Sequence, residues 1–127
     1  MEKQVKVVKF SEVEPDKIVT EKGSGSGSRV RRLITKEREG SNNIMLGVSV
    51  GEPFQEEISW TYSNIDEVYF MVSGEKTLFW EDPKGKKGEV KIVAGDAVFL
   101  PAGFKFRSVN QGSTPYFMVY ATHPALK

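Results

Sequence analysis

Short stretches in which hydrophobic and polar residues alternate follow one another along most of this chain. From Arg29 onward each stretch is rich in Val, Ile, Phe and Tyr and ends near Gly, Pro or Asn, which is typical of β-strands joined by turns. No long segment has the period of an amphipathic helix. We therefore predict strands over residues 29–35, 43–50, 56–61, 66–73, 76–81, 89–93, 96–100, 104–109 and 115–121. With a further strand expected over residues 5–10, the pattern indicates an all-β sandwich or small barrel.

Glycine, serine and proline mark the expected connections. Residues 23–28 alternate glycine and serine and are expected to hold no regular element, because ordered glycine loses much backbone entropy and serine adds no apolar surface. We interpret this segment as a flexible loop, which could be a natural surface loop, a flap over a site or an engineered linker. Residues 82–88 are predicted to form a polar hairpin loop.

Length and charge limit the classes of function. We expect residues 1–127 to form a single domain with a core over about residues 29–121. The 18 basic and 17 acidic residues are scattered and give a net charge of +1, so we expect no nucleic-acid partner and no membrane surface partner. The absence of cysteine excludes disulfides, thiolate metal sites and a cysteine nucleophile. The first ten residues lack the apolar run of a signal peptide, which favours a cytoplasmic protein.

Two groups of residues at fixed spacing form the most specific signal in the sequence. In one group, Gly95, Pro101, Gly103 and Asn110 follow the spacing G-(x)5-P-x-G-(x)6-N, and Phe106 stands between the last two. Glycine and proline at these places suit tight turns on either side of a short strand. We therefore predict a turn at 95–96, then a strand, and a second turn at 101–103.

The other group contains Trp60, Tyr62, Glu67 and Gly74 at the spacing W-x-Y-(x)4-E-(x)6-G. Together the two groups resemble the two sequence motifs of the cupin superfamily. In cupins of this pattern, three histidines and a glutamate bind Fe, Mn, Ni or Zn. The resemblance places Trp60, Tyr62 and Phe106 at the histidine positions and leaves Glu67 as the one shared ligand.

Residues 60–75 and 95–105 are similar in particular to the histidine-poor cupins of the ethanolamine-utilisation EutQ type. The resemblance covers about residues 55–121 and implies an all-β cupin barrel, which is a double-stranded β-helix or jelly roll. Because tryptophan and phenylalanine offer no useful lone pair to a metal, we expect no transition metal and no cofactor. The single histidine, His123, is interpreted as a surface residue. An oxygen-only remnant site would suit Mg or Ca, and its nearest candidate ligands are Glu56, Glu57, Asp66 and Glu67 with Tyr62.

Glu67 is the first candidate for chemistry. Its motif position implies that it points into the barrel, and strand alternation then places Tyr69 and Met71 on the same face. A carboxylate among aromatic residues is expected to have a raised pKa, which suits a general acid or base. In the alternative interpretation a hydrogen-bond donor satisfies Glu67, and the residue only holds the strands together.

Other residues are candidates for binding a ligand in the barrel. Tyr62 is expected to donate a hydrogen bond to a substrate oxygen, or only to pack against a partner. Trp60 and Phe106 are stacking walls for a flat or apolar ligand, or fill the space of the missing metal site. Arg31 shares a strand face with Arg29 and could bind a ligand carboxylate at the barrel mouth, or could protect an edge strand. The predicted ligand-binding set is thus Trp60, Phe106, Met71, Tyr69 and Arg31.

These candidates favour a metal-independent enzyme of the lyase, isomerase or hydrolase type that acts on a small organic molecule. Glu67 would be the acid or base and Tyr62 the hydrogen-bond donor. The alternatives are a non-catalytic small-molecule-binding or accessory cupin of a catabolic pathway, and a cupin dioxygenase with atypical metal ligands. A homodimer is also expected, because residues 5–10 have an apolar side to bury against a partner.

Overall fold

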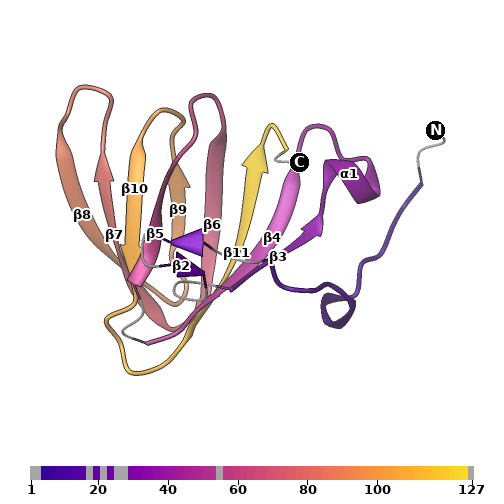
Figure 1. Cartoon of the computed structure of the whole chain (residues 1–127), viewed down its shortest axis with the longest axis horizontal. Coiled ribbons are helices and arrows are strands. Elements are labelled where there is room, and N and C mark those ends of the chain that lie inside the picture. Colours follow the sequence, from indigo (N-terminus) through magenta and orange to yellow (C-terminus); the bar gives the residue numbers. More distant parts are fainter. Residues whose placement is uncertain (1–3, 17–18, 21–22, 25–28, 54–55, 126–127) are drawn as a thin grey trace.

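The computed structural model describes residues 4–16, 19–20, 23–24, 29–53 and 56–125, and antiparallel strands dominate these residues (Figure 1). All nine strands predicted from Arg29 onward are confirmed, with bounds within two residues of those expected. No helix in these segments is long and apolar enough to cross a membrane. In chain order the elements are η1 (Phe10–Glu12), β1 (Val19–Thr20), β2 (Gly23–Ser24), β3 (Arg29–Ile34), α1 (Lys36–Glu39), β4 (Met45–Gly51), β5 (Glu56–Thr61), β6 (Asp66–Ser73), β7 (Glu75–Glu81), β8 (Lys87–Val93), β9 (Ala97–Leu100), β10 (Lys105–Val109) and β11 (Tyr116–His123).

Two larger sheets enclose the core in a jelly-roll sandwich, as predicted. The five-stranded sheet has the order β3-β4-β11-β6-β9, and the four-stranded sheet has the order β5-β10-β7-β8. Figure 1 shows the two sheets side by side, with α1 and the N-terminal segment beyond β3. The chain passes from one sheet to the other between β6 and β7 at Gly74, whose φ of 80° suits glycine. The inward faces of β6 and β7 therefore look into the same interior.

The strand predicted over residues 5–10 is wrong. Residues 4–9 run without regular secondary structure and lead into η1, so that Val5 and Val7 are 99% and 79% exposed. A strand needs a neighbouring strand with which to form backbone hydrogen bonds. On the edge of β3 that does not pair with β4, Val30 forms an isolated bridge with Asp16 instead. The alternation of Val5 and Val7 therefore produces an exposed apolar side rather than a sheet strand.

The expectation that residues 23–28 hold no regular element is also wrong in part. Gly23 and Ser24 form β2 and pair antiparallel with β1. Residues 25–28 lie outside the described residues. The predicted turns at 95–96 and 101–103 are confirmed, and the Asp96 carboxylate accepts a hydrogen bond from the backbone N–H of Val93 at 2.9 Å.

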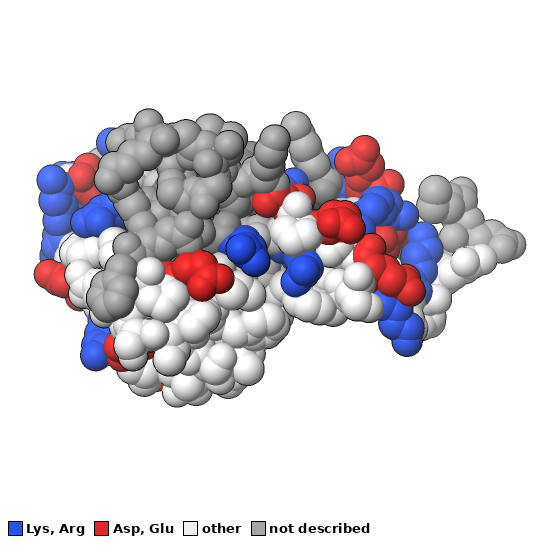
Figure 2. Space-filling view, turned by 60° about the horizontal axis from the view of Figure 1, so that its bottom comes forward, with Lys and Arg blue, Asp and Glu red and all other residues white. Residues whose placement is uncertain are grey.

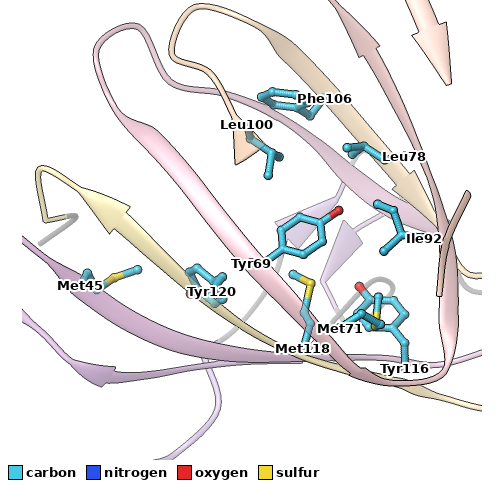
Figure 3. Close-up of a cluster of buried hydrophobic side chains, with 10 residues drawn as sticks. All are labelled: Met45, Tyr69, Met71, Leu78, Ile92, Leu100, Phe106, Tyr116, Met118 and Tyr120. Carbon is cyan, nitrogen blue, oxygen red and sulfur yellow. The ribbon is translucent and has the colours of Figure 1, made fainter. Parts of the chain in front are cut away.

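Aromatic rings fill much of the interior by lying across glycines on neighbouring strands. The Tyr120 ring lies over Gly47 of β4, the Tyr116 ring lies over Gly51 of the same strand, and the Trp80 ring lies over Gly88 of β8. Figure 3 shows Tyr69, Tyr116 and Tyr120 in one cluster with methionines of β4, β6 and β11, while Leu78, Ile92 and Phe106 come from the opposite sheet.

Replacing Gly51 by alanine is expected to lower the free energy of unfolding, because the new Cβ would overlap the Tyr116 ring. Overpacking of a dense interior typically costs about 1–3 kcal/mol, which urea or thermal unfolding measures. Tyr116→Leu removes the ring, so adding Gly51→Ala to that variant should cost much less than in the wild-type chain. Equal costs in the two backgrounds would contradict this packing.

Candidate functional site

Glu67 points into the interior and is only 7% exposed. It lies near the start of β6, where Leu100 of β9 and Thr122 of β11 are its neighbours in register. The indole N–H of Trp60 donates a hydrogen bond to Glu67 Oε1, with a distance of 3.3 Å. This contact joins the four-stranded sheet to the five-stranded sheet, because Trp60 is in β5.

Burial dominates the electrostatics of Glu67. Removal from water raises the pKa of Glu67 from 4.5 to about 7, although the positive charge of Lys76 and the hydrogen bond from Trp60 both act to lower it. A carboxyl group with this pKa can give or accept a proton near neutral pH. The raised pKa agrees with the expectation from the sequence.

The charge of Glu67 affects the pKa values of two tyrosines, Tyr62 and Tyr120. Burial raises the pKa of Tyr62 above 10.0, the negative charge of Glu67 raises it further, and the positive charge of Arg32 lowers it. The pKa of Tyr120 is also raised, first by burial and then by Glu67. Both side chains are therefore neutral phenols at neutral pH and can donate hydrogen bonds. Tyr62 follows directly after β5, and its carbonyl oxygen accepts the backbone N–H of Gly103 at 2.7 Å.

An aromatic wall extends from Trp60 along the four-stranded sheet. Phe106 of β10 is in register with Trp60 of β5 on one side and with Trp80 of β7 on the other. The ring centroids of Trp60 and Phe106 are 5.6 Å apart, those of Phe104 and Phe106 are 6.0 Å apart and nearly parallel, and those of Trp80 and Phe104 are 6.0 Å apart. These distances are typical of favourable aromatic pairs.

The structure brings together most of the residues that the sequence singled out. Glu67 and Trp60 are hydrogen-bonded, and the charge of Glu67 acts on Tyr62. Tyr69 and Met71 share the inward face of β6 and are fully buried deeper in the core, as expected from alternation. Phe106 packs against Trp60.

Arg31 is the exception, because it lies on the outer face of β3. Its guanidinium group lies 4.3 Å from the centroid of the Phe10 ring, and its Nε donates to the carbonyl oxygen of Val13 at 3.0 Å. The neighbouring residue Arg32 has the inward position, since it is in register with Gly47. The structure therefore places Arg32, and not Arg31, on the face of the candidate site.

Three charged or polar residues on inward strand faces were not assigned to the site by the sequence analysis. Arg32 forms an ion pair with Asp16, with Nε and Oδ2 2.8 Å apart, and its charge lowers the pKa values of Tyr62 and Tyr120. Lys76 of β7 is almost fully buried. Strand alternation could have found two of the three, since Lys76 shares a face with Leu78 and Trp80, and Tyr120 shares a face with Tyr116 and Met118.

The side chains that the resemblance assigns to the cupin metal positions do not fit a transition metal. Trp60 and Phe106 have no lone pair for the metal, Tyr62 is a phenol of raised pKa, and only Glu67 is a normal ligand. Among the described residues there is no group of three or more His, Cys, Asp or Glu that could hold a metal ion. His123 is exposed at the end of β11, opposite Asp66.

Comparison with known proteins finds a family model that matches part of the chain. Residues 55–115 match the EutQ-like cupin domain. Over 122 residues the chain is 29% identical to a glucose-6-phosphate isomerase of Thermococcus litoralis, a match that covers 91% of this chain and 64% of the isomerase. The chain spans less than two thirds of the length of the curated relatives that it matches.

Solved structures show the same fold. The chain is similar to a predicted oxalate decarboxylase from Thermotoga maritima, with a TM-score of 0.73, 24% identity and coverage of 95% of this chain and 100% of that one. It is also similar to KdgF from Halomonas sp., with a TM-score of 0.73, 11% identity and coverage of 95% and 96%. The match to the EutQ-like cupin domain and the jelly-roll fold together support a small cupin.

Proposed function

We propose that this cupin is a metal-independent enzyme that acts on a small organic molecule, with Glu67 as its general acid or base. The observation that carries the proposal is a carboxyl group buried in the barrel with a pKa of about 7. Perturbed groups of this kind concentrate at sites of proton transfer, because a catalyst works best when its pKa is close to the working pH.

The surroundings of Glu67 support proton transfer at a carbon or oxygen atom. The Glu67 carboxylate would accept a proton from the substrate, and the protonated carboxyl would return it. The phenol groups of Tyr62 and Tyr120 would donate hydrogen bonds to a substrate oxygen on which negative charge develops. Trp60 and Phe106 would keep water away and stack on the substrate. This division of roles suits a lyase, isomerase or hydrolase.

Two of the similar proteins have names that correspond to reactions of this kind, namely an isomerase and a decarboxylase. Isomerisation of a sugar phosphate requires a proton to move between neighbouring carbon atoms, and decarboxylation leaves a carbanion that needs a proton. Glucose 6-phosphate isomerisation and oxalate decarboxylation are therefore the first reactions to assay. A non-catalytic binding or accessory role is the other candidate, and the same barrel interior would serve it.

We expect the purified protein to contain no stoichiometric transition metal, because aromatic side chains stand at the positions of the three histidine ligands of metal-binding cupins. Elemental analysis by mass spectrometry after exhaustive dialysis measures this. A matched preparation of a histidine-containing cupin controls for loss of metal during purification. About one Fe, Mn, Ni or Zn per chain would contradict metal independence and favour a dioxygenase with atypical ligands.

The central test of the proposed function is Glu67→Gln, which keeps the size of the side chain and can keep the hydrogen bond from Trp60. If Glu67 is the acid or base, kcat should fall by about two to four decades while binding is largely retained. Glu89→Gln, at an exposed position of β8, is the matched control and should leave the rate unchanged. A Glu67→Gln enzyme as fast as the wild type would rule out the assignment. Binding without turnover by the wild-type protein, on every substrate assayed, would favour the accessory role.

The same variant has a second readout that needs no substrate. The pKa of Glu67 is higher in the folded protein than in the unfolded chain, so ionisation of Glu67 destabilises the fold as pH rises from about 4.5 through about 7. Glu67→Gln should therefore be more stable than the wild type above pH 7, by an amount on the order of 3 kcal/mol, and the difference should vanish in acid. Urea unfolding across this pH range measures the effect. A Gln variant that is less stable at neutral pH would mean that Glu67 is held as a structural anion.

We also propose that the protein is a homodimer. The outer face of the five-stranded sheet carries Val68, Phe70 and Phe99, each about half exposed or more, beside an apolar groove of about 480 Å³. The exposed Val5 and Val7 add a second apolar surface. On the described part of the face in Figure 2, acidic and basic side chains are interspersed.

Analytical ultracentrifugation is expected to show a dimer for the wild type and a monomer for Phe70→Glu, because a charge in the apolar face would lose its water on association. Val90→Glu is the matched control, since Val90 has a similar exposure on β8 of the other sheet, and this variant should stay dimeric. A wild-type monomer at micromolar concentration would refute the dimer. A dimer that Phe70→Glu does not weaken would place the interface elsewhere.

A further inference from the structure

The N-terminal residues 4–9, which we call the arm, present an apolar side to solvent. Val5 is almost fully exposed and Val7 is largely exposed. Lys6 stands between the two valines, so an extended arm has an apolar side and a basic side, as a half-buried strand has. The arm nevertheless has no regular secondary structure in its own chain. Its pattern suits a segment that lies on an apolar surface.

An apolar groove on the outer face of the five-stranded sheet offers such a surface. Its volume is about 480 Å³, and all the lining residues that the structure describes are uncharged. The outward positions of β4, β6, β9 and β11 contribute the side chains of Leu46, Val68, Phe70, Phe99, Val119 and Ala121. Phe99 is 61% exposed, and Val68 and Phe70 are each about half exposed. Exposed apolar side chains gathered in this way mark an interaction surface.

The opposite end of the same sheet face is covered by the N-terminal residues of the chain itself. Val48 of β4, which is in register with Arg31 of β3, is only 4% exposed. The ring of Phe10 has its centroid 6.3 Å from that of Phe117 and 4.3 Å from the guanidinium carbon of Arg31. The residue that follows the arm by one position therefore already packs on this face.

The contacts of the arm direct it away from the groove of its own chain. Lys6 Nζ donates a hydrogen bond to the carbonyl oxygen of Glu39 at 3.0 Å, and Glu39 is the last residue of α1, which follows β3. β3 is one edge of the five-stranded sheet, whereas β9 is the other edge and β6 is next to it. Figure 1 shows the N-terminal segment beyond β3 and α1, away from β6 and β9. The apolar side of the arm and the groove are thus both left exposed within one chain.

We propose that two copies of the protein exchange their arms, so that the arm of each copy lies in the groove of the other. This inference rests on the homodimer proposed above and adds which segment fills the groove. Because each copy offers both an arm and a groove, a two-fold axis lets both contacts form at once and closes the assembly at two copies. Val5 and Val7 enter the groove, while Lys6 stays in water on the opposite side of the arm.

The distribution of charge favours the arm as the occupant of the groove. On the outward positions of β6 and β9 the one charged residue is Asp66, which is acidic and exposed. The arm contains Lys6 and Lys9 and no acidic residue. Opposite charges at the rim of an apolar contact steer the two surfaces together and help to fix their register.

Cysteine cross-linking tests the exchange directly, because the chain has no cysteine of its own. Val7→Cys is combined in turn with Val68→Cys, Ala97→Cys or Phe99→Cys, all at exposed positions. Mild oxidation of at least one pair should give a covalent dimer on a non-reducing gel, which a thiol reductant reverses. A disulfide requires Cα atoms within about 7 Å of each other, so the bond reports direct proximity.

Two sets of controls accompany the cross-linking. Val7→Cys with Val90→Cys is the matched pair, since Val90 is partly exposed on β8 of the other sheet, and it should give no covalent dimer. Each single-cysteine variant shows how much dimer arises from a bond between two identical positions.

Val5→Ser with Val7→Ser removes the apolar side of the arm at positions that are already exposed, so the fold of each copy should be kept. This variant should raise the Kd of the dimer by about tenfold or more, because the apolar area buried in the groove is lost. Sedimentation over a range of concentrations measures the Kd. Val90→Ser with Val93→Ser, which changes two exposed valines of β8, is the matched control and should leave the Kd unchanged.

The outcomes separate the exchange of arms from the homodimer itself. A wild-type monomer would refute both. A wild-type dimer that gives no covalent dimer with any of the three cysteine pairs, or whose Kd is unchanged by the two serine substitutions, would keep the homodimer and overturn the exchange. A disulfide within one chain, seen as a monomer without free thiols, would show that the arm occupies its own groove and would also overturn the exchange.

Discussion

The interior of this barrel depends on aromatic rings that lie flat across glycines. Tyr120 over Gly47 and Tyr116 over Gly51 let large side chains of β11 fit beside β4 without pushing the strands apart. Any larger residue at those glycines would collide with the rings, so the close packing of β4 against β11 holds the tyrosines in place. The inward residues of β6, which pairs with the other edge of β11, lie beside these rings on the same face of the sheet. Glu67 is one of these inward residues, and Trp60 of the opposite sheet donates a hydrogen bond to it.

Burial and charge act on Glu67 in opposite directions, and the outcome defines the candidate site. A carboxyl group taken out of water would stay protonated far above neutral pH if nothing opposed burial. Lys76 and the indole of Trp60 favour the ionised form and bring the pKa to about 7. The Nζ atom of the same lysine lies close to the Ser108 hydroxyl group and to the rings of Tyr69 and Tyr116. The acid–base character of Glu67 therefore depends on residues of both sheets.

Much of the fold could be predicted from the sequence, because period-two alternation and turn residues are local signals. The site was only partly predictable. Glu67, Trp60 and Phe106 were selected from motif spacing. Arg31 was selected because it shares a strand face with Arg29, but alternation does not show which of the two strand faces points inward. The register of β3 against β4 determines which arginine points inward, because Arg32 is paired with Gly47. The strand expected over residues 5–10 failed for a related reason, since alternation shows an apolar side but not a partner strand.

The resemblance to the cupin motifs assigns aromatic residues to the histidine positions, which changes the chemistry expected of Glu67. Beside three imidazole ligands and a divalent cation, a carboxylate at this position would be held ionised by the metal charge and would serve as a ligand. With Trp60 and Phe106 in those places, the strongest influence on Glu67 is the loss of water, which favours the protonated form. The same strand position can thus supply a metal ligand or a titrating acid. The choice depends on whether neighbouring side chains bring in a cation or exclude solvent. Here burial raises the pKa of Glu67 more than the positive charge of Lys76 lowers it.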